Sequence, residues 1–198
     1  MKPRRPGRLG VLGGTFDPPH LGHLLLAECA REALALDRVV FVPARVPPHK
    51  SGRRVTPAAT RLALVRAALR GTGFAVSTLE LSRPGPSYTV DTLLALSRRH
   101  PGAELFLVVG ADSLLDLPHW REPGRIQELS SLAVAARPGV RVSRVPRAVR
   151  GRLTWLPNLP IGIASSDLRE RVAQGRSIRF LVPDAVARLI ARKRLYRS

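Results

Sequence analysis

Short apolar runs alternate along this chain with longer segments in which apolar positions recur every three or four residues. Continuous apolar runs are typical of strands covered on both faces, and the second pattern is typical of helices with one buried face. Strands are predicted at 9–12, 38–42, 74–76, 78–81, 104–110, 132–136 and 153–156. Helices are predicted at 22–36, 57–70, 88–99, 113–117, 124–129, 166–174 and 183–193. This alternation predicts an α/β fold with a parallel sheet flanked by helices.

The succession of elements continues without a break along the chain. The run at 104–110 is the most continuous of all and predicts a central strand. We find no internal repeat and no linker-like segment, so residues 1–198 are predicted to form a single domain, long enough for a hydrophobic core. Two basic segments, 43–55 and 137–150, are predicted loops. The second either closes over a substrate or merely tolerates changes in length.

The net charge narrows the range of partners. It is +19 at pH 7, and all of the 33 basic residues except Lys2, Lys50 and Lys193 are arginines. This balance favours anionic ligands such as nucleotides, and it also raises nucleic-acid binding as an alternative. However, the basic residues are spread through every segment, and aromatic residues make up only 5% of the chain. We therefore expect no specific nucleic-acid site.

The chain shows neither a disulfide framework nor a membrane signal. Its one cysteine, Cys29, cannot form an internal disulfide, and it shares an apolar helical row with Leu25 and Ala33, which indicates an inert core thiol. The basic start, Met1 to Gly7, is not followed by the apolar region of a signal peptide. No apolar stretch approaches the roughly 18 residues of a membrane span. A cytoplasmic protein without a membrane partner is expected.

The segment between the first predicted strand and the first predicted helix carries the chemistry. It reads GGTFDPPHLGH and begins at Gly13. Gly13 and Gly14 let the backbone approach a phosphate closely, and the following helix adds N–H donors and the positive end of its dipole. His20 and His23 lie three positions apart, so both imidazoles can face one anion. Together with the Thr15 hydroxyl they predict a phosphoryl-transfer site; the alternative is an incidental glycine turn with capping histidines.

This segment resembles the signature of the HxGH nucleotidyltransferases, and the chain as a whole resembles one family among them, the bacterial nicotinate-nucleotide adenylyltransferases. Similar stretches follow in the same order over nearly the whole length, at 42–50, 86–93, 110–113, Leu117 with Trp120, 163–169, 181–183 and Leu195 with Tyr196. The resemblance implies a Rossmann-like, doubly wound sheet with helices on both faces. It also implies transfer of AMP from ATP to nicotinate mononucleotide, giving deamido-NAD and pyrophosphate in NAD biosynthesis.

This reaction makes few demands on the enzyme's own reactive groups. The attacking phosphate oxygen is already ionised near pH 7, so the attack is direct and in line, without a general base or a covalent enzyme intermediate. Positioning and preorganised donors would supply most of the acceleration. Mg²⁺ is expected as a partner of the ATP phosphates. The sequence shows no cluster with metal-ligand spacing, so no protein ligands are assigned to it.

The resemblance also implies the residues on the ATP side. The catalytic residues are His20 and His23, and the ATP-binding residues are Gly13, Gly14, Thr15, Phe16, His20, His23, Gly110, Asp112, Ser165, Ser166 and Arg169. Asp17 either orients its loop or closes an Asx-turn, and Asp112 either contacts the adenosine ribose or caps a helix. For Ser165, Ser166 and Arg169 the alternative is an ordinary helix cap with a surface arginine. Ala164 and Asp167 depart from the family pattern ISSTxIR and leave those two contacts open.

On the acceptor side the resemblance implies a second group. The residues that bind nicotinate mononucleotide are His49, Lys50, Ser87, Tyr88, Thr89, Trp120 and Arg121. The first two could instead belong to a solvated basic loop. The Trp120 indole suits a flat pyridinium by stacking, or it is a core residue. The charge of Arg121 would favour an acid over an amide. After the proline that ends the second predicted strand, Ala44 and Arg45 stand where the family often has asparagine.

Three alternative enzymes remain close to this prediction. They are relatives acting on nicotinamide mononucleotide, phosphopantetheine or flavin mononucleotide. An aminoacyl-tRNA synthetase, which has a similar HIGH motif, is excluded because too little chain remains for a second catalytic motif and a tRNA module. The sequence leaves the oligomeric state open.

Overall fold

The computed structural model describes residues 6–47, 55–136, 153–157 and 161–197. Over these residues six strands form one sheet in which every neighbouring pair is parallel. Their bounds are β1 (Arg8–Gly14), β2 (Arg38–Pro43), β3 (Ala75–Val76), β4 (Glu104–Gly110), β5 (Ser131–Ala135) and β6 (Leu153–Leu156). The order across the sheet is β3-β2-β1-β4-β5-β6, so the winding reverses between β1 and β4. The sheet is therefore doubly wound and Rossmann-like.

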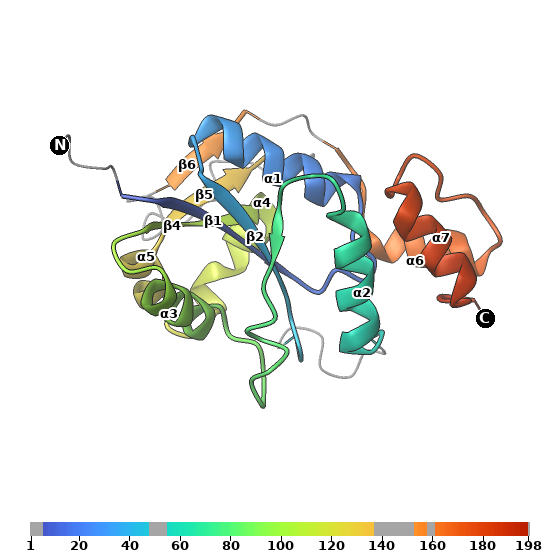
Figure 1. Cartoon of the computed structure of the whole chain (residues 1–198), viewed down its shortest axis with the longest axis horizontal. Coiled ribbons are helices and arrows are strands. Elements are labelled where there is room, and N and C mark those ends of the chain that lie inside the picture. Colours follow the sequence, from blue (N-terminus) through green and yellow to red (C-terminus); the bar gives the residue numbers. More distant parts are fainter. Residues whose placement is uncertain (1–5, 48–54, 137–152, 158–160, 198) are drawn as a thin grey trace.

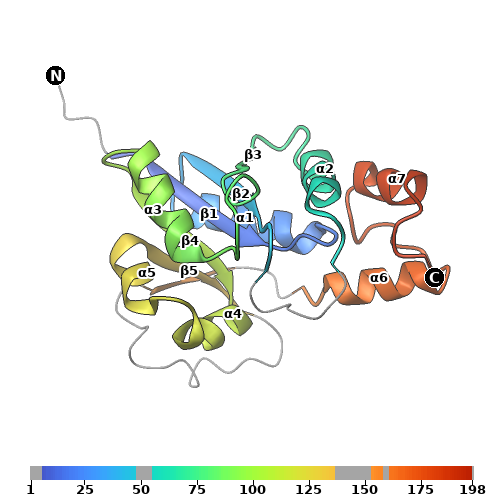
Figure 2. The ribbon, with the colours of Figure 1, turned by 90° about the horizontal axis from the view of Figure 1, so that it is seen from below.

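Helices cover both faces of this sheet (Figures 1 and 2). Their bounds are α1 (Leu21–Ala33), α2 (Ala58–Ala68), α3 (Thr89–Arg99), α4 (Ala111–Asp116), η2 (Leu117–His119), α5 (Pro123–Leu129), α6 (Ser165–Ala173) and α7 (Asp184–Arg192). On one face α1 and α2 pack on the strands through residues such as Ala30 and Val65. On the other face α3, α4 and α5 do so through residues such as Leu93, Leu114 and Ile126. This two-sided cover explains the continuous apolar runs, because each strand needs apolar side chains on both faces.

The last two helices form a separate layer outside α2. Figure 2 shows α6 and α7 at the end of the molecule, beyond α2. Leu64 of α2, Leu168 of α6 and Val186 of α7 are buried together in one cluster. The helix α6 ends at Ala173, and Gly175, two residues later, has a φ of +68°, a conformation in which glycine commonly follows a helix end. The C-terminal part of the chain is thus attached to the core through α2.

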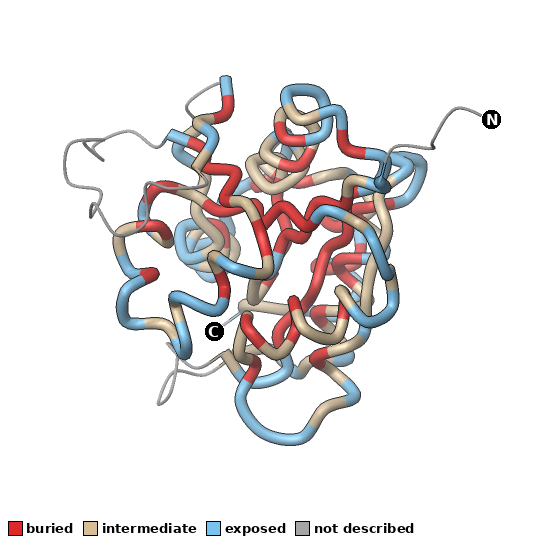
Figure 3. The backbone as a smooth tube through the Cα atoms, turned by 90° about the vertical axis from the view of Figure 1, so that its left-hand side faces the viewer, coloured by how far each residue is buried: buried red, intermediate tan, exposed pale blue. Residues whose placement is uncertain are grey.

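The burial pattern agrees with the predicted order of elements. Figure 3 shows the buried backbone running through the sheet, with exposed residues along the outer turns. All residues of β4 between Leu105 and Val109 are buried, as predicted for a central strand. None of the helices in the described ranges is both long and apolar enough to cross a bilayer. The basic segment 137–150, for which two roles were left open, lies outside the described residues.

One predicted strand is wrong, and the helix ends differ by one to a few residues. Residues 78–81 form a turn, in which the Ser82 N–H donates to the Thr78 carbonyl at 3.1 Å. Leu79 and Leu81 alternate with polar residues there, as in a strand, but the buried side chain is that of Glu80, whose carboxyl group accepts a bond from the Thr92 hydroxyl at 2.6 Å. The alternation of residue types therefore does not match the side chains that are buried. The first helix also ends earlier than predicted, at Ala33.

Candidate active site

A cavity of about 490 Å³ opens at the carboxyl ends of β1 and β4, where the winding of the sheet reverses. This is the position at which open α/β sheets hold their ligands. The predicted site residues that line it are Gly13, Gly14, Thr15, His23, Ser87, Tyr88, Thr89, Gly110, Asp112, Trp120 and Arg121. The fold therefore brings residues predicted for ATP and residues predicted for the acceptor to one cavity.

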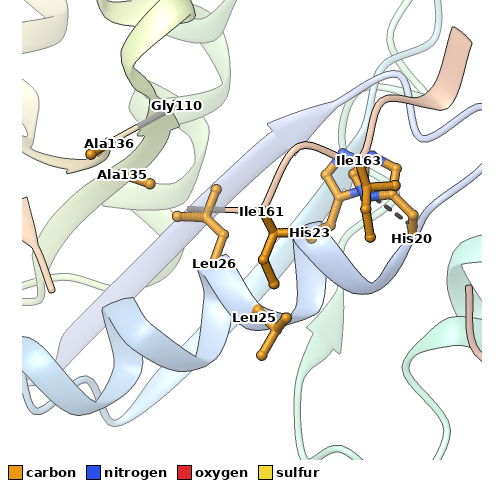
Figure 4. Close-up of a pocket in the computed structure, with 10 residues that line it drawn as sticks. His20, His23, Leu25, Leu26, Gly110, Ala135, Ala136, Ile161 and Ile163 are labelled. Atoms are coloured by element: carbon orange, nitrogen blue, oxygen red, sulfur yellow. Dashed lines mark hydrogen bonds between the residues drawn. The ribbon is translucent and has the colours of Figure 1, made fainter. Parts of the chain in front are cut away.

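A smaller cavity of about 50 Å³ lies beside the first and extends it along α1. His23, Leu26 and Gly110 line both cavities, so the two are neighbours at the end of β4. The remaining wall of the smaller cavity includes His20, Leu25 and Ile163 (Figure 4). Figure 4 shows the two imidazoles together at the start of α1, under Ile163. The two histidines therefore lie where the two cavities adjoin.

The two imidazoles are fixed by the start of α1. His20 is the residue preceding the helix, and its backbone N–H donates to Nδ1 of His23 at 3.2 Å. Their ring centroids lie 3.7 Å apart with the planes tilted by 31°, and the centroids of the Phe16 and His23 rings lie 5.0 Å apart in an edge-on arrangement. Because Nδ1 of His23 accepts this bond, the neutral ring carries its proton on Nε2. His23 is thus oriented as a donor through Nε2.

The glycine between the histidines has a steric reason. A Cβ atom added at Gly22 would lie 3.0 Å from Nδ1 of His20 and 3.2 Å from Cε1 of the same ring. That spacing is tighter than ordinary contact, so a larger residue would push the imidazole out of place. Gly13, in contrast, has nothing within 4 Å of such an added atom. It lines the large cavity, which agrees with a backbone that a phosphate can approach closely.

Phe16, predicted to contact ATP, has a buried side chain, and the contact itself stays a prediction. It is 2% exposed and adopts φ of +51°, which an L-residue rarely takes. Its ring packs against His23 and Phe41, and it would meet a Cβ atom added at Gly14 at 3.0 Å. The side chain therefore belongs to the core below the loop. Only its backbone remains for a ligand contact.

Asp17 orients its loop, which decides between the two alternatives. The residue is 3% exposed, and its partners are far along the chain. One carboxylate oxygen accepts the Thr56 N–H at 3.1 Å and the other accepts the Tyr196 hydroxyl at 2.7 Å. Burial, together with the bond to Asp17, raises the pKa of Tyr196 well above its ordinary value. The loop that carries the histidines is thereby tied to the last residues of the chain.

Arg61, which sequence reasoning did not single out, supports the same loop from below. Only 1% of it is exposed, and its guanidinium donates to the Thr15 carbonyl at 2.8 Å. Burial lowers the pKa of Arg61, and the charge of Asp17 acts in the opposite direction. The sequence does indicate that Arg61 is buried, because it lies three and four positions before Leu64 and Val65 on the buried face of α2.

The predicted second phosphate element lies directly on the first. The Ser165 hydroxyl donates to the Pro18 carbonyl at 2.9 Å, and Arg169 donates to the Asp17 carbonyl at 2.8 Å. Ser166 is exposed at the start of α6, where its hydroxyl donates to Asp167 at 3.0 Å. The structure therefore brings Ser165 and Arg169 to the loop at the start of α1. Contact of these groups with phosphate stays a prediction.

Asp112 lies in the first turn of α4, which begins two residues earlier than predicted. Gly110 precedes the helix, so the alternative of Asp112 as the helix cap is wrong. The Asp112 side chain is exposed and lines the large cavity.

Among the residues that the structure describes, no group of three or more His, Cys, Asp or Glu side chains could hold a metal ion. Cys29, predicted to be an inert core thiol, is partly buried in α1.

On the acceptor side, aromatic and cationic groups are combined. The Trp120 indole packs against the core, its Nε1 donates to Asp116 at 3.3 Å, and the residue also lines the cavity. It is therefore both a core residue and a cavity residue. The Arg121 guanidinium lies 4.7 Å from the centre of the Tyr88 ring. His49 and Lys50 lie outside the described residues.

Sequence reasoning also missed Glu80 in this wall. It is 6% exposed and lines the large cavity next to Ser87. Burial raises the pKa of Glu80, while hydrogen bonds from Thr92 and Ser87 lower it. The Ser87 hydroxyl oxygen in turn accepts the Arg45 N–H at 2.8 Å. Glu80 and Ser87 thus join the segment after β2 to the start of α3.

Comparisons with known proteins agree with this site. The family described as cytidylyltransferase-like matches residues 11–171. A protein of Thermomicrobium roseum named probable nicotinate-nucleotide adenylyltransferase is 53% identical over 96% of this chain and 92% of its own. One of Thermus thermophilus with the same name is 45% identical over 96% and 100%.

The fold has a counterpart among solved structures. The nicotinic acid mononucleotide adenylyltransferase of Plasmodium falciparum, complexed with NaAD, has a TM-score of 0.82 over 96% of this chain and 97% of that one. Their sequences are 17% identical, so this likeness concerns the fold. The similarity to the two bacterial relatives covers nearly the full length of this chain. The chain therefore belongs to the cytidylyltransferase-like family and, within it, to the nicotinate-nucleotide adenylyltransferases.

Proposed function

We propose that this chain transfers the adenylyl group of ATP to nicotinate mononucleotide in NAD biosynthesis. A phosphate oxygen of the mononucleotide forms a bond to the α-phosphorus of ATP as the bond to pyrophosphate breaks, giving deamido-NAD. The observation that carries the proposal is the cavity at the ends of β1 and β4, which the histidine loop and the Trp120 segment share. Family membership supports the same reaction.

The enzyme's part in this step is to position two anions and to stabilise charge. The acceptor phosphate is ionised near pH 7, so no base must create the nucleophile. Negative charge that gathers on the transferred group meets the Nε2 donor of His23, the neighbouring ring of His20 and the N–H groups at the start of α1. Such donors are already oriented before the reaction, because His23 is held by the backbone of His20.

The ATP side is proposed to extend from the histidines to α6. The Arg169 guanidinium has five N–H donors, of which the Asp17 carbonyl takes one, so the side chain can also reach phosphate oxygens. Ser165 and Ser166 would offer the N-terminus of α6 to the β- and γ-phosphates. Asp112 lines the large cavity, and its proposed partner is the adenosine ribose.

Mg²⁺ is proposed to be held by the ATP phosphates. The described residues offer no cluster of three ligands for it, so we assign no protein ligand. When bound, it would neutralise part of the triphosphate charge. The steps above use the groups of this chain alone.

The acceptor is proposed to lie against Trp120. A flat, cationic pyridinium suits an indole face, and the carboxylate of the ring suits N–H donors near Thr89. Arg121, held over the Tyr88 ring, adds a positive charge at the same wall. That charge favours the acid over the amide. His49 and Lys50 remain predicted ligands of the acceptor phosphate.

A product assay tests this function. The chain is incubated with ATP and, in separate reactions, the acid mononucleotide, the amide mononucleotide, phosphopantetheine and flavin mononucleotide. Pyrophosphate and the adenylylated product are measured in each. We expect the acid to be turned over with the highest kcat/KM. Equal or reversed preference for the amide would contradict the substrate, and release of pyrophosphate without a dinucleotide would contradict the reaction.

A further inference from the structure

Arg61 makes three hydrogen bonds that all go to backbone carbonyls. Its Nε donates to Thr56 at 2.8 Å, its Nη1 to Thr15 at 2.8 Å and its Nη2 to Arg45 at 3.1 Å. The residue is 1% exposed, so water does not take the place of these acceptors. The planar guanidinium sets the three donors in one rigid fork. Arg61 therefore fixes three separate backbone segments relative to one another.

Two of these segments lie on opposite sides of the proposed reaction. Thr15 belongs to the loop after β1, which leads to the histidines and lines the large cavity. Arg45 follows β2, and its backbone N–H donates to Ser87 at the acceptor wall, at 2.8 Å. The segments meet also where the Ala44 N–H donates to the Gly14 carbonyl at 2.9 Å. The Arg61 guanidinium thus holds the loop after β1, on the ATP side, and the segment after β2, on the acceptor side, in a fixed relative position.

We propose that Arg61 is a positioning residue that sets the distance and angle between the ATP phosphates and the acceptor phosphate. The inference rests on the proposed function. In an in-line transfer without an enzyme nucleophile, the relative placement of the two substrates controls the rate, and an error of about 1 Å can cost roughly 100-fold. Arg61 touches neither substrate. It acts through the Thr15 and Arg45 backbones.

The primary test is Arg61→Lys, with Arg66→Lys as the matched control. Lysine keeps the positive charge but cannot reproduce the three-donor fork, whereas Arg66 is exposed on the same helix. We expect kcat of Arg61→Lys to fall roughly 10- to 100-fold, with each KM within about threefold of wild type. Arg66→Lys should match the wild type in every parameter. All rates are measured at a temperature at which circular dichroism shows each variant folded.

A second variant separates positioning from general damage. Arg61→Ala leaves a space for a free guanidinium ion, which can occupy the fork's place without covalent attachment. We expect millimolar guanidinium to restore part of its kcat and to have no such effect on Arg61→Lys, whose ammonium occupies the space. If Arg61→Ala does not fold, Arg61→Lys alone decides.

The outcomes distinguish this inference from the proposed function. Wild-type protein without adenylyl transfer would overturn the proposed function itself. An active wild type with an unchanged kcat in Arg61→Lys would overturn the role of Arg61 only. A rise in one KM at unchanged kcat would also overturn this role, because it would indicate that Arg61 serves the binding of one substrate. A loss of rate that matches the unfolded fraction of the variant would overturn it as well.

Discussion

His23 allows a test in which the two functions of one imidazole are separated. Its Nδ1 accepts the His20 N–H at 3.2 Å and supports the start of α1, while Nε2 is the proposed donor to the transferred phosphate. In His23→Asn, the side-chain oxygen can take the place of Nδ1 as the acceptor, but nothing reaches the position of Nε2. In His23→Ala both functions are lost. The pair therefore distinguishes catalysis from helix support.

The structure sets the expected magnitudes. Loss of one preorganised donor costs about 100- to 1,000-fold in kcat, or about 2.7–4 kcal/mol of transition-state stabilisation. Loss of one hydrogen bond at the helix start costs about 0.5–1.5 kcal/mol of folding free energy. We therefore expect both variants to lose kcat by at least about 100-fold. Only His23→Ala should unfold at a clearly lower denaturant concentration.

The assay combines steady-state release of pyrophosphate with urea unfolding. His100→Asn is the control, because His100 lies at the far end of α3 and does not line either cavity. Its kcat should equal that of the wild type. A nearly normal kcat in His23→Asn would refute the donor role of Nε2. A kcat in His23→Asn far above that of His23→Ala would show that helix support, not the donor, carries the effect.

Three further predictions concern groups around the cavity. Tyr196→Phe removes the donor to the buried Asp17 carboxylate, so unfolding free energy should fall by about 1.5–3 kcal/mol in urea titrations; an unchanged midpoint would contradict this. Burial raises the pKa of Glu80 above its ordinary value of 4.5, so the folded state binds the proton more tightly than the unfolded state. The wild type therefore loses stability as the pH rises from the unfolded-state pKa of Glu80 to its folded-state pKa. Glu80→Gln should therefore gain in Tm relative to wild type from about pH 4.5 upward until the folded pKa is passed, and a difference independent of pH would refute the assignment. Trp120→Ala should raise the KM for nicotinate mononucleotide by roughly two- to thirtyfold, since stacking on a cation contributes about 0.5–2 kcal/mol; an unchanged KM would exclude the stacking role.

Much of this molecule could be predicted from local patterns. Each strand is covered on both faces and therefore needs apolar residues at consecutive positions, as at 104–110. The histidine loop was visible for a similar reason. Gly22, His20 and His23 interact within one helical turn, and such a spacing can be recognised without knowing the fold.

The supports of that loop depended on partners distant in the sequence. Tyr196 meets Asp17 across 179 positions, and Arg169 meets the same residue's carbonyl across 152. Residues 78–81 were predicted as a strand because the local pattern does not show that Thr92 bonds to Glu80. Local periodicity reports only where apolar residues recur. Which polar group compensates a buried charge is settled when separate segments pack, since the cost of burying it is relieved only by a partner at hydrogen-bond distance.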